Sequence, residues 1–194
     1  MLLGVLYVKV SWAQLYNDIG ECEKCRLCET RTNVVVGEGD PHARVMFIGE
    51  GPGQEEDRQG RPFVGRSGEL LTRMIQAIGM ERTEVYICNV VKCRPPKNRN
   101  PEPDEAAACL NYLRGQVALV RPKVVVLLGK VACQYTLNEQ VFITRDHGRW
   151  YERKGVWFMP TFHPSALLRD PAKKRDAWED FKKIRDKLKE LSEA

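Results

Sequence analysis

The chain has 194 residues, 43% of them hydrophobic and 29% charged, which is the composition of one globular domain spanning residues 1–194. The formal net charge of +5 at pH 7 allows a nucleic-acid partner without requiring one. No apolar run reaches the roughly 18 residues that a membrane span needs, and the apolar residues 1–10 lack the basic start and cleavage site of a signal peptide. We therefore expect a cytoplasmic protein with no membrane association.

Short apolar runs and helical patterns alternate along the chain. Four runs rich in β-branched or aromatic residues predict buried strands at 45–48, 85–91, 124–128 and 156–159. Helices are predicted from the apolar spacing of Leu70 to Ile78, which ends at Gly79; from Pro103 or Asp104 to Val120; and from the stripe Trp178, Phe181, Ile184, Leu188 and Leu191. This alternation predicts an α/β fold, in which helices cover both faces of a parallel sheet.

Seven cysteines in a chain without an export signal favour metal ligation or buried thiols over a disulfide framework. Cys22, Cys25 and Cys28 have the C-x2-C-x2-C spacing at which a tight turn brings thiolates to one metal centre. A bacterial ferredoxin run would place a further cysteine at position 32, where Thr32 stands, so the other ligands must come from elsewhere.

The remaining cysteines divide into two kinds. Cys93 follows a predicted strand and Cys109 lies on the next helix, so both can approach the N-terminal cysteines, whereas Cys88 and Cys133 lie inside apolar elements where a thiol packs as a small hydrophobic group. Zinc is the competing metal, although zinc ribbons usually take their second half from another x2 pair. Spacing alone leaves an iron-sulfur centre and zinc both open.

Two loops at predicted strand ends carry candidate functional groups. After the first strand, residues 49–57 and 60–68 are rich in glycine, which lets backbone amides approach a ligand where open α/β sheets bind one. Neither a dinucleotide fingerprint nor a P-loop fits this spacing, and a structural turn is the alternative. After the fourth strand, His163 lies between Phe162 and Pro164, a placement that suits a hydrogen-bond donor. His42 and His147 lie in polar loops and are expected to have no functional role.

Five segments occur in the order known from one protein family. They are RTNVVVGEG at 31–39, GEGPG at 49–53, GRPFVG at 60–65, CNVVKCRPP at 88–96 and PTFHPS at 160–165. Together they resemble the iron-sulfur, family-four branch of the uracil-DNA glycosylase superfamily, a prokaryotic branch with many thermophile members, over almost the whole chain. The resemblance implies a three-layer α/β/α sandwich with a central four-stranded parallel sheet and an active site at the strand ends.

The resemblance also implies an activity and a cofactor. The activity is that of a monofunctional DNA repair enzyme, which flips uracil out of DNA and hydrolyses its N-glycosidic bond to leave an abasic site. The cofactor is one structural 4Fe-4S cluster on Cys22, Cys25, Cys93 and Cys109, which would join the 22–28 segment to the 93–109 loop and helix, with Cys28 as a spare. The implied partner is uracil-containing DNA, single- or double-stranded, bound by a monomer at the nucleoid.

Roles for individual residues follow from the same resemblance. Phe63 would stack on the extruded base, Asn89 would hydrogen-bond to its edge, and His163 would donate to uracil O2 as the bond breaks. Backbone amides around Glu50 and Gly51 would add to this donor group, and Glu56 is a further substrate-binding candidate. The implied DNA contacts are Leu167, which would fill the gap left by the flipped nucleotide, and Ser165, Arg169, Arg94, Lys97 and Arg99.

The chain departs from two other branches of the superfamily. Where the best-known branch has a water-activating aspartate, this chain has Gly51, so the carboxylate must be Glu50, Glu56 or Asp57, or no strong base is needed. The basic motif of the covalent DNA-trapping branch is absent, which favours hydrolytic turnover. Two other functions stay open: a non-catalytic iron-sulfur DNA-binding accessory of a DNA polymerase, and a zinc-stabilised module that binds small nucleotides, which the acidic glycine loop disfavours.

Overall fold

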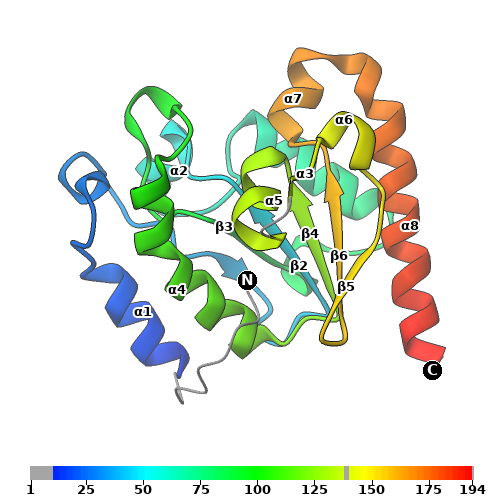
Figure 1. Ribbon diagram of the computed structural model, residues 1–194, viewed down its shortest axis with the longest axis horizontal. Helices are drawn as coiled ribbons and strands as arrows, with labels where there is room; N and C mark the ends of the chain where they lie inside the picture. The colour runs from blue at the N-terminus through cyan, green and yellow to red at the C-terminus, as the bar shows by residue number, and fades with distance from the viewer. Residues whose placement is uncertain (1–10, 138–139, 194) are drawn as a thin grey trace.

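Four parallel strands form the centre of a six-stranded sheet in the computed structural model, which describes residues 11–137 and 140–193 (Figure 1). The strands are β1 (Glu38–Gly39), β2 (Val45–Gly49), β3 (Tyr86–Asn89), β4 (Val124–Leu128), β5 (Tyr151–Arg153) and β6 (Val156–Thr161), in the order β1-β3-β2-β4-β6-β5. The expected central parallel sheet is confirmed as β3-β2-β4-β6. The expectation about residues 1–10 lies outside the described residues.

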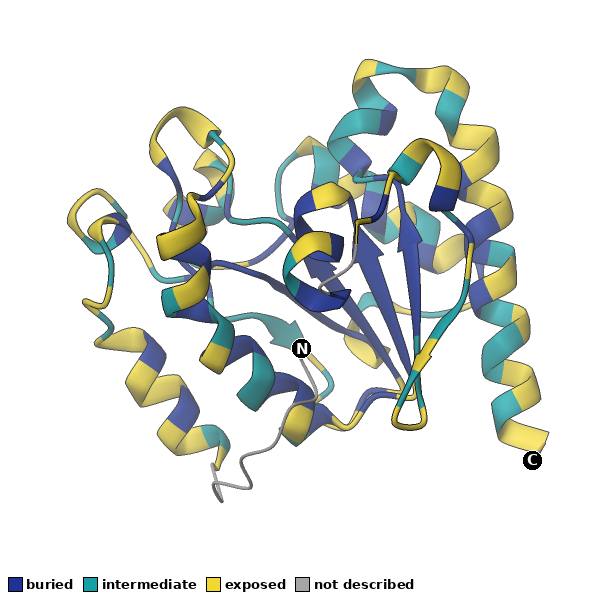
Figure 2. Ribbon diagram, in the orientation of Figure 1, coloured by how far each residue is buried: buried dark blue, intermediate teal, exposed yellow. Residues whose placement is uncertain are grey.

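Two short strands at the sheet edges were not predicted. β1 pairs antiparallel with β3, and β5 pairs antiparallel with β6. They contain only two and three residues, too few to show a period of alternation. Figure 2 shows the four central strands buried, while β1 and β5 are partly exposed, as short edge strands commonly are.

Helices cover both faces of the sheet and confirm the three layers (Figure 1). The α-helices are α1 (Trp12–Gly20), α2 (Gln54–Gln59), α3 (Arg66–Ala77), α4 (Pro103–Val120), α5 (Lys130–Leu137), α6 (Ile143–Asp146), α7 (Pro164–Arg169) and α8 (Lys174–Glu193). Short 3-10 turns lie at Arg26–Glu29, Arg82–Glu84, Pro96–Asn98 and Pro171–Lys173. Within the described ranges, no helix has both the length and the apolar character needed to cross a bilayer.

Alternation along β2 divides the core between the two faces. Met46 and Ile48 pack with α1, α4 and α5, whereas Val45 and Phe47 pack with α3 and α8. Every residue of β2 is buried, as expected for a central parallel strand with helices on both sides. The continuous apolar run that predicted this strand therefore has its physical cause in two covered faces.

The long helices begin and end close to their predicted positions. α4 begins with Pro103 at its first position, and Glu102 and Glu105 form a capping box. α8 buries the expected Phe181 and Ile184, but the prediction for Trp178 is wrong, since 37% of its surface is exposed and Ala177 takes the inward position. The hydrophobic pattern favoured the large aromatic side chain, but it is the small Ala177 that packs against Phe162 and Leu167.

The carboxyl ends of the four parallel strands lie at one edge of the sheet. Gly49 at the end of β2 pairs in register with Asn89 at the end of β3, and Leu128 pairs with Thr161 at the ends of β4 and β6. The residues that follow these positions are therefore brought together although they are distant in the sequence. This edge is where open α/β sheets bind ligands.

Candidate active site

A cleft opens at the carboxyl ends of the strands. Its walls come from the loops after β2 and β4, the end of β3 and the turn from β6 into α7. The predicted site residues that line this cleft are Glu50, Gly51, Glu56, Phe63, Asn89, Arg99, His163, Ser165 and Arg169. Asp57, Leu167, Arg94 and Lys97 are not among the lining residues. The structure thus brings most of the expected site together at one place.

Asn89 and Phe63 meet next to Gly49. Asn89 is 1% exposed, and its Oδ1 atom has no hydrogen-bond partner among the described residues. Because a buried polar atom without a partner costs free energy, this oxygen is suited to accept a hydrogen bond from a ligand. A Cβ atom at Gly49 would lie 2.4 Å from Asn89 Oδ1 and 2.5 Å from Phe63 Cζ. The lack of a side chain at Gly49 therefore gives both side chains their room.

His163 is fixed by the first turn of α7. The backbone N–H of Ser165 donates to His163 Nδ1 at 3.1 Å, and Ser165 Oγ lies 2.7 Å from the same atom. Since a backbone N–H can only donate, Nδ1 is an acceptor, and the proton of the neutral ring lies on Nε2. Burial, together with the charge of Arg169, lowers the pKa of His163 to about 4, so the ring is neutral at pH 7.

The imidazole of His163 also lies close to the other ring of the cleft. Its centroid is 5.6 Å from that of Phe63, at an interplanar angle of 35°. A planar ligand next to Phe63 would therefore have the donor Nε2 of a neutral histidine in its neighbourhood.

Glu50 is the carboxylate that fits a catalytic role best. It follows β2 directly and lines the cleft. Burial raises the pKa of Glu50, and the positive charge of Arg169 offsets part of that rise. A carboxylate with a raised pKa in a cleft is a suitable proton acceptor near neutral pH.

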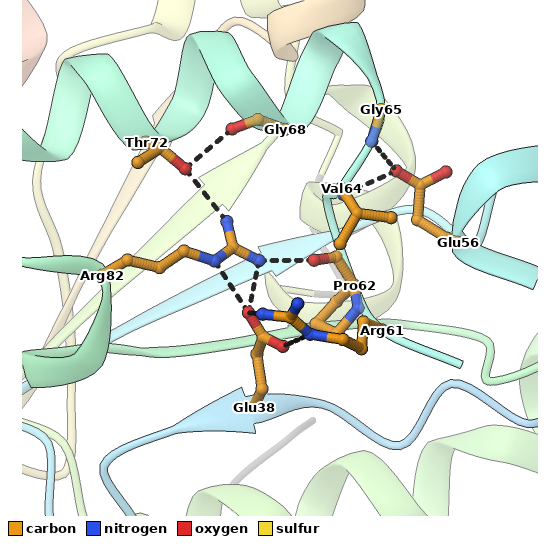
Figure 3. Close-up of polar contacts among 9 residues, drawn as sticks. All are labelled: Glu38, Glu56, Arg61, Pro62, Val64, Gly65, Gly68, Thr72 and Arg82. Atoms are coloured by element: carbon orange, nitrogen blue, oxygen red, sulfur yellow. Dashed lines mark hydrogen bonds and ion pairs between the residues drawn. The ribbon is translucent and has the colours of Figure 1, made fainter. Parts of the chain in front are cut away.

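The carboxylates of Glu56 and Asp57 accept hydrogen bonds from backbone N–H groups of neighbouring segments. Glu56 Oε1 accepts hydrogen bonds from the backbone N–H groups of Val64 at 2.9 Å and Gly65 at 3.0 Å (Figure 3). The carboxylate of Asp57 is buried and accepts from the backbone N–H groups of Thr32 and Asn33. The structure therefore contradicts Asp57 as a water-activating group, because it lies outside the cleft and its oxygen is already hydrogen-bonded.

The expected DNA contacts have different surroundings. Leu167 is 1% exposed and packs with Phe162 and Ala177, so its predicted insertion into DNA does not agree with its place in the core. The resemblance implied this role, but this face of α7 is turned towards α8, where Ala177 lies. The neighbouring Leu168 is partly exposed.

The basic residues also differ from one another. Arg99 forms a two-point ion pair with the buried Glu105, at 2.8 and 2.7 Å, so its charge is largely compensated. Arg94 donates to Asn98 at 2.7 Å, and Lys97 is exposed. Arg169 is exposed at the rim of the cleft, which leaves it the best placed of these residues for a phosphate.

Five cysteines line one small cavity, which is separate from the cleft and is lined in part by the 93–109 segment. These are Cys22, Cys25, Cys28, Cys93 and Cys109. Arg31 joins its two sides, because its Nη1 donates to the Cys22 carbonyl at 2.6 Å and to Cys93 Sγ at 3.3 Å. Within the described ranges no three His, Cys, Asp or Glu side chains are grouped closely enough to hold a single ion. Thiols around one cavity have the donor chemistry that an iron-sulfur centre requires.

Sequence reasoning missed Lys92, which lies between the cleft and the cysteines. Its side chain is buried, and its Nζ donates to the Asn89 carbonyl and to Gln116 Oε1, both at 2.6 Å. Gln116 in turn donates to the Val36 carbonyl and to the hydroxyl of Tyr86. A lysine within the apolar run NVVKC is the signal that could have identified it. Cys88 and Cys133 are buried in the core, as predicted.

His147 has a partner that its polar loop did not suggest. Its Nδ1 lies 3.0 Å from a carboxylate oxygen of the buried Asp180, which also accepts from Thr161 Oγ1 at 2.7 Å. The His147 ring packs on Phe162, with centroids 4.7 Å apart. These contacts support the end of β6 immediately before His163. His147 therefore has a structural role, and the expectation that it has no functional role stays a prediction.

Comparison with known proteins places this geometry in a family. The family model described as "Uracil DNA glycosylase superfamily" matches residues 36–185. The chain is 46% identical to the type-4 uracil-DNA glycosylase of Sulfurisphaera tokodaii over 91% of its own length and 84% of that protein. It is 47% identical to the type-4 enzyme of Thermotoga maritima, with 95% and 98% covered, and 44% identical to that of Archaeoglobus fulgidus, with 88% and 89% covered.

Proposed function

The chain belongs to the type-4 branch of the uracil-DNA glycosylase superfamily, and on that basis we propose how its cleft releases uracil from DNA. It is a DNA repair glycosylase that hydrolyses the N-glycosidic bond of deoxyuridine and leaves an abasic site. The observation that carries the mechanism is the meeting of Asn89, Phe63 and His163 around a cleft in which a buried oxygen of Asn89 has no partner among the described residues.

Base selection rests on Asn89 and Phe63. Asn89 Oδ1 accepts a hydrogen bond from uracil N3–H, and its amide N–H donates to uracil O4. Cytosine presents an acceptor and a donor at these two positions, so the same amide meets it with the wrong pattern. Phe63, whose ring lies next to Asn89 and His163, stacks on the extruded base.

Bond cleavage places negative charge on the leaving uracil. The neutral His163 donates from Nε2 to uracil O2, because Nδ1 is already occupied as an acceptor from Ser165. A donor that is already oriented stabilises the developing charge without reorganisation in the transition state. Glu50 accepts the proton of the attacking water, since its pKa is raised and it lines the cleft. Glu56 acts indirectly by holding the backbone next to Phe63.

The five-cysteine cavity is the place for a 4Fe-4S cluster. We assign its ligands to Cys22, Cys25, Cys93 and Cys109, with Cys28 as the spare, on the resemblance to the family and on their common cavity. The bound cluster would supply structural cross-links between the N-terminal turn, the 93–99 loop and α4. Zinc is the alternative metal.

Uracil-containing DNA approaches from the rim of the cleft, where Arg169 offers a positive charge, and the exposed Lys97 can add to it. We propose that the protein acts as a monomer on the chromosome in the cytoplasm. A non-catalytic role as an accessory of a DNA polymerase would not require an unpaired Asn89 oxygen, a stacking ring and an oriented histidine at one place.

Uracil release from a labelled oligonucleotide tests this function. Single- and double-stranded substrates with one uracil should both be assayed, and each should give an alkali-sensitive abasic site and free uracil. The matched oligonucleotide with cytosine at the same position should stay intact. Binding of DNA without release of uracil would instead support the accessory role.

A further inference from the structure

The segment that carries Phe63 has a backbone conformation that a phenylalanine does not adopt on its own. Phe63 has a φ of +50°, in the left-handed region that favours glycine, yet its side chain is buried next to Asn89 and His163. A strained residue at a functional site persists only where its surroundings fix it. The contacts that fix Phe63 therefore determine where the stacking ring lies.

Arg82, in the turn before β3, holds the residue before Phe63. Its Nη2 donates to the carbonyl of Pro62, its Nε donates to Glu38 at 2.7 Å, and its Nη1 lies 3.3 Å from Thr72 Oγ1 (Figure 3). The hydroxyl of Thr72 in turn donates a hydrogen bond to the carbonyl of Gly68 in α3. One guanidinium thus connects the Phe63 segment, strand β1 and helix α3.

Glu38 fixes the orientation of that guanidinium. Its carboxylate accepts from Arg82 and also from Arg61 Nε at 2.8 Å. Burial alone would raise the pKa of Glu38, but the two guanidinium groups outweigh it and the net pKa is lowered. The two arginines are unequal, because the Arg82 side chain is 17% exposed and that of Arg61 is 60% exposed. An exposed pair contributes little, so Arg82 is the partner that matters for the position of the segment.

Helix α3 closes the other side of the segment. A Cβ atom at Gly68 would lie 1.8 Å from the Phe63 carbonyl oxygen, so the backbone of Phe63 rests directly on the helix. Glu56 holds the two following amides, those of Val64 and Gly65. Pro62, Phe63 and Val64 are thus each fixed by a different contact. Among these contacts, the Arg82 hydrogen bond alone comes from outside the cleft and its adjoining helix.

We propose that Arg82, oriented by Glu38, is a positioning residue for uracil excision, which holds Phe63 in its strained conformation through the Pro62 carbonyl. This inference rests on the proposed stacking role of Phe63. Arg82 itself touches no substrate, since it is not among the residues that line the cleft. Loss of Arg82 should let Phe63 relax towards ordinary backbone angles and move its ring away from the base.

The test is a double-mutant cycle with a matched control. Arg82→Met removes the donors and keeps an apolar stem, and Arg61→Met removes the more exposed guanidinium from the same carboxylate. We expect Arg82→Met to lower single-turnover uracil excision by about 10- to 100-fold, the scale of a displaced binding group, and Arg61→Met to change it by less than about 3-fold. In a Phe63→Ala background, Arg82→Met should add less than about 3-fold, because the ring it positions is gone.

Hydrogen exchange supplies a readout that does not depend on activity. Amides of residues 60–68 should exchange faster in Arg82→Met than in the parent or in Arg61→Met, with the rest of α3 unchanged. Exchange at parent rates, or an equal loss of excision with and without Phe63, overturns the proposal. A parent protein that releases no uracil would overturn the proposed function by itself, and the exchange data would still decide whether Arg82 holds the segment.

Discussion

The imidazole of His163 and the backbone amide of Ser165 are joined by a hydrogen bond of 3.1 Å that determines which ring nitrogen carries the proton. The acceptor is Nδ1, so the neutral ring presents Nε2–H. The tautomer is therefore built into the first turn of α7 and does not depend on the side chain of Ser165.

Replacing His163 by alanine should slow excision strongly. Removal of an oriented donor to developing negative charge costs about 100- to 1000-fold in rate, or about 2.7 to 4 kcal/mol. Single-turnover kinetics on a uracil oligonucleotide measure this loss, and binding of abasic-site product should stay near the parent value. Ser165→Ala is the control: it keeps the backbone N–H, so the loss should be far smaller. Excision by His163→Ala at the parent rate would remove the histidine from the mechanism.

The lowered pKa of His163 also predicts that its contribution to protein stability is lost in acid. An unfolded histidine binds its proton near pH 6.5, whereas the folded one does so at about 4. Because the unfolded state binds the proton more tightly, the contribution of His163 to stability is full above pH 6.5 and declines as the pH falls towards 4. Thermal denaturation of the parent and of His163→Ala across this range should show a smaller acid loss in the variant.

Glu50 and Arg169 predict a second pH dependence. If Glu50 accepts the proton of water, the excision rate should fall on the acid side as its raised pKa is crossed. Arg169→Gln removes a charge that lowers this pKa, so the acid limb should move to higher pH. Glu50→Gln should lower the rate and remove the limb. If the acid side of the pH–rate profile is unchanged in Arg169→Gln, a group other than Glu50 causes the fall in rate.

Asn89→Asp should shift the selectivity of excision from uracil towards cytosine. The aspartate replaces the amide donor by an acceptor, so it should cut uracil excision and admit some cytosine, whose exocyclic amine can donate to it. Paired assays on uracil and cytosine oligonucleotides measure the ratio. Asn89→Ala is the companion variant, expected to lose uracil excision without gaining cytosine. Unchanged selectivity in the alanine variant would show that another residue contacts the base edge.

The cysteine cavity predicts an unequal response to substitution. The parent purified without air should contain roughly four irons per chain, the content of one 4Fe-4S cluster. Cys109→Ala should lose most of this iron and its visible absorption, whereas Cys28→Ala should keep both. Cys133→Ala, a change at a buried cysteine of α5 that does not line the cavity, controls for general loss of stability. One zinc per chain in place of iron would contradict the assignment.

Strands and long helices could be predicted because their causes are local. The run at 45–49 is apolar throughout since both faces of β2 are covered, and α4 begins at a proline with a capping box that is visible in the sequence. Short edge strands were missed because two or three residues carry no period. Trp178 was misplaced since hydrophobicity alone ranks it above Ala177.

Within the site, the residues proposed to contact the base were easier to predict than the residues that hold them in position. Asn89, Phe63 and His163 were identified from their motifs, and their convergence follows from the shared edge of four parallel strands. Arg82 and Glu38 lie 44 positions apart, and their contact depends on how β1 pairs with β3. The burial of Leu167 likewise depends on where α8 lies, which no local pattern states.

The close contact between Gly68 and the Phe63 carbonyl has a consequence for mutational tolerance. Gly20 and Gly68 are both helical glycines, yet a Cβ atom at Gly20 would have nothing within 4 Å, while one at Gly68 would collide with backbone. In a saturation-mutagenesis survey scored by uracil excision, position 20 should accept most residues, and many should improve the helix. Position 68 should accept glycine only. Any side chain at position 68 would displace the backbone of Phe63, so this position of α3 cannot vary in sequence while the stacking ring keeps its place.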